Sequence, residues 1–106
     1  MGKDYNKLVR DRIPEIIRQS GINCEIAVLS DEEYRIALRL KLIEEATEAA
    51  EANENELVAE LADLYEVIDA LMLSYGISGD RLLNAQAKRR ETRGGFAQKI
   101  MLLRTL

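Results

Sequence analysis

Residues 41–63 constrain the fold more than any other part of the chain, and they read K-L-I-E-E-A-T-E-A-A-E-A-N-E-N-E-L-V-A-E-L-A-D. The stretch is rich in Ala, Leu and Glu, which favour helix. Its one interruption is the polar segment 53–55, where Asn favours a helix end or a turn because its short amide bonds nearby backbone. The stretch therefore predicts two antiparallel helices joined by a tight turn.

Two groups of carboxylates lie in this predicted hairpin: Glu44, Glu45 and Glu48 in the first helix, and Glu60 and Asp63 in the second. At about 1.5 Å per residue, Glu48 and Glu60 each lie about 9 Å from the turn, and the other three lie roughly 13–15 Å from it. Residues three or four apart share a helix face, so the two groups can face each other. Carboxylates that converge in this way repel, and a divalent cation is the simplest group that makes the clustering favourable.

A solvated helix face is the alternative interpretation of these acids, and it is the usual one for a lone E-E-x-x-E motif. Lys41 is the only cation near the first group, so ion pairs along the helix do not explain it. Glu60 and Asp63 lie on one flank of an apolar stripe rather than in the middle of a polar face. The stripe has spacing 4-3-4-3-4 and consists of Leu57, Leu61, Leu64, Ile68, Leu71 and Tyr75.

Composition narrows the chemistry of such a site. The chain has 106 residues, enough for one domain over residues 1–106, with no His and only Cys24 as a cysteine. An internal disulfide, His catalysis, and Ser-His or Cys-His nucleophiles are therefore excluded, and a zinc site is disfavoured. A site made only of oxygen ligands suits Mg²⁺, or alternatively Mn²⁺.

Charge and hydropathy bear on partners and location. A formal net charge of −4 argues against binding of polymeric nucleic acid, although a nucleotide substrate remains compatible with it. No 18-residue apolar run and no secretory segment is found, so we expect a cytoplasmic protein without a membrane partner.

The remaining sequence predicts an all-α fold in which a third helix accompanies the hairpin. Ser30 and Glu33 form a capping box for the first long helix, and Asn53 caps the second. The expected helices cover residues 14–20, 31–52, 54–75 and 79–92, with Gly21 and Gly76 as stops and Ser78 as a cap. Residues 24–29 and 99–104 lean towards strand, and they most simply pair with each other as a small two-stranded β element.

The first long helix is apolar on two sides, and one hairpin partner cannot cover both. One side carries Leu38, Leu42 and Ala49, and the other carries Ile36, Leu40, Ile43 and Ala50. We expect the second side to pack against the third helix or against a second subunit. We therefore expect a homodimer, or a dimer of dimers, that forms a helical bundle.

Two basic segments flank the hairpin. Lys7, Arg10 and Arg12 form an arm that is either solvated or able to reach phosphates, and composition favours a solvated arm. Lys88 and Arg93 belong to a cluster of four cations in six residues, followed by Gly94-Gly95. This cluster either binds phosphate, which Arg forks suit, or complements a helix C-terminus.

Together, an acidic site for a hard metal ion and a phosphate-binding cluster suggest metal-assisted hydrolysis of a phosphoanhydride. A bound cation would acidify a water molecule, a nearby carboxylate would take its proton, and Lys and Arg would neutralise the leaving pyrophosphate.

The acid motif E44-E-x-x-E48 with E60-x-x-D63 resembles that of the MazG-like all-α nucleotide pyrophosphohydrolases. Three further segments resemble a small subgroup that is often labelled phosphoribosyl-ATP pyrophosphohydrolase-like. They are Y5-N-K-L-V-R-D-R-I-P14, L-S-D-E-E-Y at 29–34, and K88-R-x-x-x-R-G-G-F96. The resemblance implies a dimeric helical enzyme that uses Mg²⁺ to split a nucleoside triphosphate, or a related nucleotide, into a monophosphate and pyrophosphate.

Transferred position by position, the resemblance implies that metal is held by Glu44, Glu45, Glu48, Glu60 and Asp63. We assign the catalytic role to Glu45 and Glu48, and substrate binding to Lys41, Lys88 and Arg93. Only eleven residues separate Glu48 from Glu60, a short connector that leaves substrate choice open. The histidine expected after the second acid group of a phosphoribosyl-ATP enzyme is replaced by the sequence Leu64-Tyr65-Glu66. The alternative hypothesis is a non-catalytic helical dimer that binds nucleotide or a protein partner.

Overall fold

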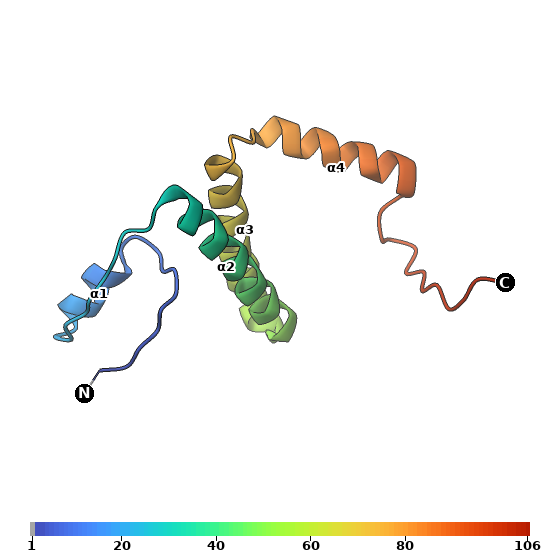
Figure 1. Ribbon diagram of the computed structural model, residues 1–106. Coiled ribbons are helices and arrows are strands. Elements are labelled where there is room, and N and C mark those ends of the chain that lie inside the picture. The colour runs from blue at the N-terminus through green and yellow to red at the C-terminus, as the bar shows by residue number, and fades with distance from the viewer. Residues whose placement is uncertain (1) are drawn as a thin grey trace. The chain divides into compact units, whose positions relative to one another are not determined.

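The computed structural model describes residues 2–106, and within them every regular element is a helix. The helices are α1 (Ile13–Gln19), α2 (Asp31–Glu51), α3 (Glu54–Ser74) and α4 (Gly79–Arg93) (Figure 1). The predicted all-α class is confirmed, and each predicted helix is present within one or two residues of its expected ends. None of the helices in residues 2–106 has the length and apolarity needed to cross a bilayer.

The hairpin of α2 and α3 begins and ends where the capping residues predict. The Ser30 hydroxyl accepts from the Glu33 backbone N–H at 3.2 Å, and the Glu33 carboxylate accepts from the Ser30 backbone N–H at 3.2 Å. The Asn53 side chain accepts from the Glu56 backbone N–H at 3.0 Å and so starts α3 directly after the turn. Gly76 stops the second helix with a φ of 67°, a left-handed conformation that Gly adopts without strain.

The chain divides into two compact units, one ending at Tyr75 and the other spanning Gly76–Leu106. The single domain predicted for residues 1–106 stays a prediction. In the first unit α2 and α3 lie side by side, as Figure 1 shows, and their packing provides its core. The core is small: Leu38 on α2 is 2% exposed and Val67 on α3 is 7% exposed.

The buried face of α3 is offset from the predicted apolar stripe. Leu57, Leu61 and Tyr75, all members of that stripe, are exposed, whereas Val67 is buried and lies outside it. The face that packs against α2 follows a second series of the same spacing, and its members are Glu60, Leu64, Val67, Leu71 and Ser74. Glu60 therefore lies on the buried face of α3 itself, and not on its flank.

The buried face of α2 follows the matching series, whose members are Tyr34, Leu38, Lys41 and Glu45. Glu45 and Glu60 are equally far from the turn in sequence, and so are Leu38 and Val67. The hairpin thus has an apolar half and, nearer the turn, a charged half.

Two Arg side chains of α2 form hydrogen bonds with the C-terminal end of α3, at the end of the hairpin away from the turn. Arg35 donates to the Ser74 carbonyl oxygen through Nε at 3.1 Å and Nη2 at 2.6 Å. Arg39 donates to the Tyr75 hydroxyl at 3.3 and 3.1 Å, and both guanidinium groups lie over the Tyr75 ring. Positive charge at the last carbonyls of a helix is favourable because it complements the helix dipole.

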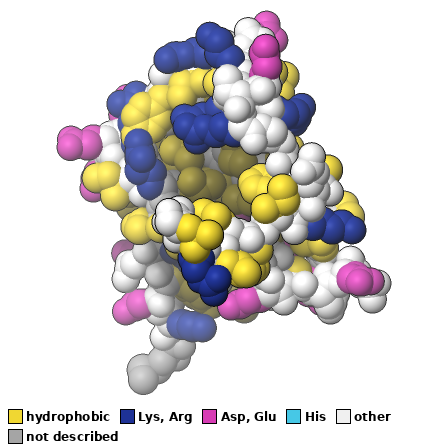
Figure 2. All heavy atoms as spheres, turned by 90° about the vertical axis from the view of Figure 1, so that its right-hand side faces the viewer, with side chains coloured by type: hydrophobic (Ala, Val, Ile, Leu, Met, Phe, Trp, Pro, Cys, Tyr) yellow, Lys and Arg dark blue, Asp and Glu magenta, His cyan; other side chains and the backbone are white. Residues whose placement is uncertain are grey.

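The second predicted apolar side of α2 is exposed. Ile36 is 57% exposed, and Leu40 and Ile43 are each 64% exposed. Apolar side chains are also visible at the surface in Figure 2, among Lys and Arg side chains. The expected cover by another helix or subunit stays a prediction.

The expected two-stranded element is not formed within residues 2–106, where segments 24–29 and 99–104 are irregular. The first segment belongs to the first unit and the second to the other unit. A strand without a partner is not stable, which accounts for the irregular chain at both places.

The second unit contains α4 and an irregular tail. The Ser78 hydroxyl caps α4 by accepting from the Arg81 backbone N–H at 3.1 Å. No residue of Gly76–Leu106 is buried, and the apolar side chains of the tail are exposed, among them Phe96 and Leu103.

Candidate metal centre

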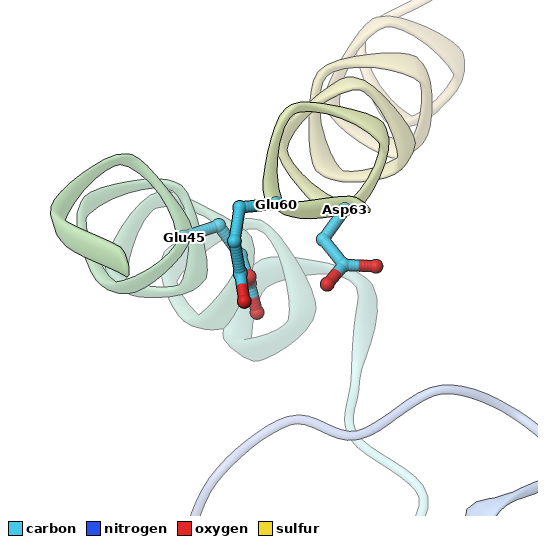
Figure 3. Close-up of side chains that lie close together, drawn as sticks. All are labelled: Glu45, Glu60 and Asp63. Carbon is cyan, nitrogen blue, oxygen red and sulfur yellow. The ribbon is translucent and has the colours of Figure 1, made fainter. Parts of the chain in front are cut away.

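Three of the five predicted acids come together in the charged half of the hairpin. Glu45 of α2 and Glu60 and Asp63 of α3 each offer a carboxylate oxygen, and these oxygens all lie within 4.8 Å of one another (Figure 3). The grouping follows from the fold, because Glu45 and Glu60 lie on the two facing series and Asp63 is one turn beyond Glu60.

The burial of this cluster leaves two oxygens without a partner. Glu45 is only 8% exposed. The Oε2 atoms of Glu45 and Glu60 are buried and accept no hydrogen bond from residues 2–106. A buried polar atom without a partner costs about 1–3 kcal/mol, and more when it is charged. This arrangement is unfavourable as it stands, and a bound cation would satisfy both oxygens.

The donor set fits a hard divalent cation. All three groups are carboxylates on rigid helices, with no thiol or imidazole beside them. Oxygen ligands of this kind suit Mg²⁺, Mn²⁺ or Ca²⁺ and not zinc or copper.

The electrostatics of Glu45 agree with that fit. Burial raises the pKa of the Glu45 carboxyl, and the negative charge of Glu48 raises it further, while Lys41 acts in the opposite direction without cancelling the effect. The ionised form of Glu45 is therefore disfavoured in the folded chain, and a divalent cation would favour it by displacing the proton.

Glu44 and Glu48 lie on α2 beside this cluster. Burial raises the pKa of Glu44, but the hydrogen bonds and positive charges of Lys41 and Lys7 together outweigh burial and leave that pKa below its usual value. Glu48 is exposed and acts on Glu45 through its charge. Neither belongs to the group of three in this structure, so their roles as metal ligands stay predictions.

Lys41 lies among the acids, with Nζ 3.2 Å from Glu44 and 3.4 Å from Glu45. Its side chain is only 16% exposed. The structure therefore gives Lys41 an orienting and neutralising position between two carboxylates. Its contact with substrate stays a prediction.

The N-terminal arm is exposed, as the solvated interpretation expects, but two of its three cations also pair with acids of the site. Lys7 Nζ lies 3.2 Å from Glu44 Oε1, and Arg10 Nη2 lies 2.7 Å from Asp63 Oδ1. Arg12 is solvated as expected, with a side chain 78% exposed and an ion pair only to Glu15 three residues on.

The ion pairs of the arm could have been anticipated only from the balance of charge between acids and cations. A convergence of acids in one place attracts any cations that the chain can bring to it. Lys7 and Arg10, three residues apart in the arm, are available for that purpose, but nothing in their local sequence says which acids they reach.

The two predicted substrate-binding residues of the C-terminal cluster, Lys88 and Arg93, lie on α4 in the second unit and are exposed. Arg93 is in the last turn of α4, directly before Gly94. Their contact with phosphate stays a prediction.

Comparison with known proteins adds one relative. The chain is 50% identical, over 54 residues, to a protein from Mycolicibacterium smegmatis (strain ATCC 700084 / mc(2)155) that is described only as an uncharacterized protein. The match covers 51% of this chain and 55% of the relative, so the chain spans about half the length of that protein. No protein-family model matches the chain, and no solved structure does so.

Proposed function

We propose that this protein is a Mg²⁺-dependent nucleotide pyrophosphohydrolase, with Mn²⁺ as an alternative cation. The observation that carries the proposal is the group of three carboxylates within 4.8 Å, with two buried oxygens that lack any partner. The resemblance of the acid motif to that of the MazG-like superfamily gives the reaction class. It is the attack of water on a nucleoside triphosphate, or a related nucleotide, to give a monophosphate and pyrophosphate.

In this proposal Glu45, Glu60 and Asp63 hold the cation, and Glu44 and Glu48 are the further candidates. When bound, the cation supplies charge neutralisation for phosphate oxygens and acidifies a water molecule. Glu48, exposed one turn from Glu45, accepts the proton of the attacking water. Lys41 keeps Glu44 and Glu45 in position from its ion pairs with both. Lys88 and Arg93 bind substrate phosphates, as the resemblance implies.

The experiment is pyrophosphate release from a panel of nucleotides in Mg²⁺, with and without EDTA. Turnover is expected in Mg²⁺ or Mn²⁺ and is expected to be lost in EDTA, in Glu45→Gln and in Asp63→Asn, with helical circular dichroism unchanged. Glu66→Gln, an exposed acid on α3, is the matched control and should retain activity. Undiminished hydrolysis in EDTA, or near-normal turnover in both site variants, would refute the proposal.

We also propose that the protein acts as a homodimer or a dimer of dimers. Support comes from the exposed apolar side of α2, formed by Ile36, Leu40 and Ile43, and from exposed Val58 and Tyr65 on α3. A second subunit would also offer partners for segments 24–29 and 99–104. The proposed location is the cytoplasm.

A non-catalytic helical dimer that binds nucleotide or a protein partner is the second candidate. The observation in its favour is that Lys7, Arg10 and Lys41 already pair with acids of the site. Binding of nucleotide without pyrophosphate release from any member of the panel would favour it.

A further inference from the structure

We propose that the N-terminal arm, residues 7–12, supplies the phosphate-binding side of the carboxylate site, with Lys7 and Arg10 exchanging Glu44 and Asp63 for substrate phosphate once a divalent cation is bound. The inference rests on the proposed function and adds to it the residues that recognise the pyrophosphate group. Composition favours a solvated arm over one that reaches phosphates, and the fold places Lys7 and Arg10 in ion pairs with acids of the site.

The arm approaches the cluster from the side that the carboxylates face. In Figure 3 the oxygens of Glu45 and Glu60 point towards the side on which the blue N-terminal segment passes. Lys7 and Arg10 reach an acid on each helix, Glu44 on α2 and Asp63 on α3. Leu8, between them in sequence, is half-buried. A ligand at the cluster would therefore meet these two side chains.

The count of charged side chains shows how much positive charge the site lacks. Five acids lie in this region, namely Glu44, Glu45, Glu48, Glu60 and Asp63, and three cations pair with them, namely Lys7, Arg10 and Lys41. With all five acids ionised, two negative charges remain, which is the charge that one divalent cation neutralises. The buried, unpartnered Oε2 atoms of Glu45 and Glu60 mark the place where the compensation is missing.

The two ion pairs made by the arm are exposed enough for their cations to exchange one anionic partner for another readily. The Lys7 and Glu44 side chains are 46% and 32% exposed, and the Arg10 and Asp63 side chains are 55% and 43% exposed. Ion pairs at such exposure contribute little to stability because water competes for both partners. Lys41 differs, since it is largely buried and pairs with two acids at once. Release of the arm is therefore easier than release of Lys41.

The donors that remain suit phosphate. An ammonium has three donors and a guanidinium has five in a planar fork, and each uses only part of this capacity on its carboxylate. A divalent cation at the cluster competes with Arg10 for Asp63, and with Lys7 where Glu44 also binds the cation, so both side chains then have donors free beside it. Phosphate oxygens are strong acceptors for such groups, and charge-assisted bonds to them are about twice as strong as neutral ones.

The test measures Mn²⁺ binding and pyrophosphate binding separately, in Lys7→Met, Arg10→Met and the control Arg12→Met. Inorganic pyrophosphate is the probe because it is a product of every substrate in the proposed class. Binding of Mn²⁺ alone is measured from the electron spin resonance signal of the free ion. Its affinity should increase roughly threefold or more in Lys7→Met and Arg10→Met, because a competing positive charge has been removed. Binding of pyrophosphate in saturating Mg²⁺ should weaken about tenfold or more in the same variants. Arg12→Met should change neither.

The opposite directions of the two effects separate this role from a structural one. Weaker Mn²⁺ binding in both arm variants would mean that the arm only supports the metal site, and it would overturn the inference. Unchanged pyrophosphate binding in both, or an equal loss in Arg12→Met, would overturn it as well, and neither result touches the proposed function. A wild-type protein that binds no Mn²⁺ would instead overturn the proposed function, and this inference with it.

Discussion

At the scale of single residues, Glu45 combines the highest burial with the least favourable charge in the site. Its position on α2 was predictable from the sequence, because helical spacing brings Glu45 and Glu60 level across a tight turn. Its burial was not predictable. The apolar stripe of α3 suggested that Glu60 and Asp63 lie at the flank of the packed face, and therefore that the acids of α2 opposite them are also outside the core. Two overlapping series of the same 4-3 spacing run along α3, and periodicity alone does not choose between them.

The raised pKa of Glu45 gives a prediction about stability. A carboxyl whose pKa is higher in the folded chain than its usual 4.5 loses its proton more easily when unfolded. Deprotonation of Glu45 therefore favours unfolding. The stability contributed by this carboxyl falls as the pH rises from its usual pKa of 4.5 through the raised pKa of the folded chain. In EDTA at neutral pH, Glu45→Gln should have a higher Tm than wild type, and the difference should shrink below pH 4.5.

A thermal scan against pH in EDTA checks this expectation. Glu66→Gln is the control, since it removes an exposed charge on α3 that does not belong to the group of three. A Glu45→Gln protein with a lower Tm than wild type at neutral pH would contradict it. Glu44 acts in the opposite sense, because its lowered pKa contributes stability that is lost in acid, so the comparison is made between the variant and wild type at each pH.

At the scale of elements, the helix ends were the most predictable part of the chain. Capping depends on contacts within four residues, and Ser30, Asn53 and Ser78 each accept the backbone N–H that their positions require. The pairing of the arm with α2 and α3 was not predictable, because it joins residues 37 and 53 positions apart. Ion pairs at such separations depend on the fold and not on local pattern.

The turn between α2 and α3 offers a test at this scale. Asn53→Ala removes the acceptor for the Glu56 N–H and should lower the free energy of unfolding by about 0.5–2 kcal/mol, as measured by urea denaturation. Asn55→Ala, two residues on and inside α3, should be neutral or slightly stabilising because Ala favours helix. Equal losses in the two variants would show that the cap does not fix this turn.

At the scale of the whole molecule, apolar surface is the dominant feature. Ile36, Leu40 and Ile43 are more than half exposed on α2, and Tyr65 is 67% exposed on α3. The sequence predicted that α2 needs cover on two sides, but no local pattern decides whether a third helix or a second subunit supplies it. The two-stranded element is likewise not formed within residues 2–106, because a local preference for strand does not specify the partner that a strand needs.

The predicted assembly follows from this surface. Light scattering at micromolar concentration should give a mass of at least twice the 12.0 kDa of the chain. Leu40→Glu places a charge on the exposed apolar side and should shift the mass towards the monomer, while helical circular dichroism is retained. A wild-type monomer of 12.0 kDa would show that the apolar side of α2 serves another purpose.

The claim on which the whole account depends is that the carboxylates of Glu45, Glu60 and Asp63 hold a divalent cation. Calorimetric titration of the wild-type protein and of Glu60→Gln with Mn²⁺ tests it most directly, since Glu60 has a buried oxygen with no partner. The expected result is saturable binding in wild type and at least a tenfold loss of affinity in Glu60→Gln, with Glu66→Gln unchanged. Equal binding in wild type and Glu60→Gln, or no binding in either, would contradict the account.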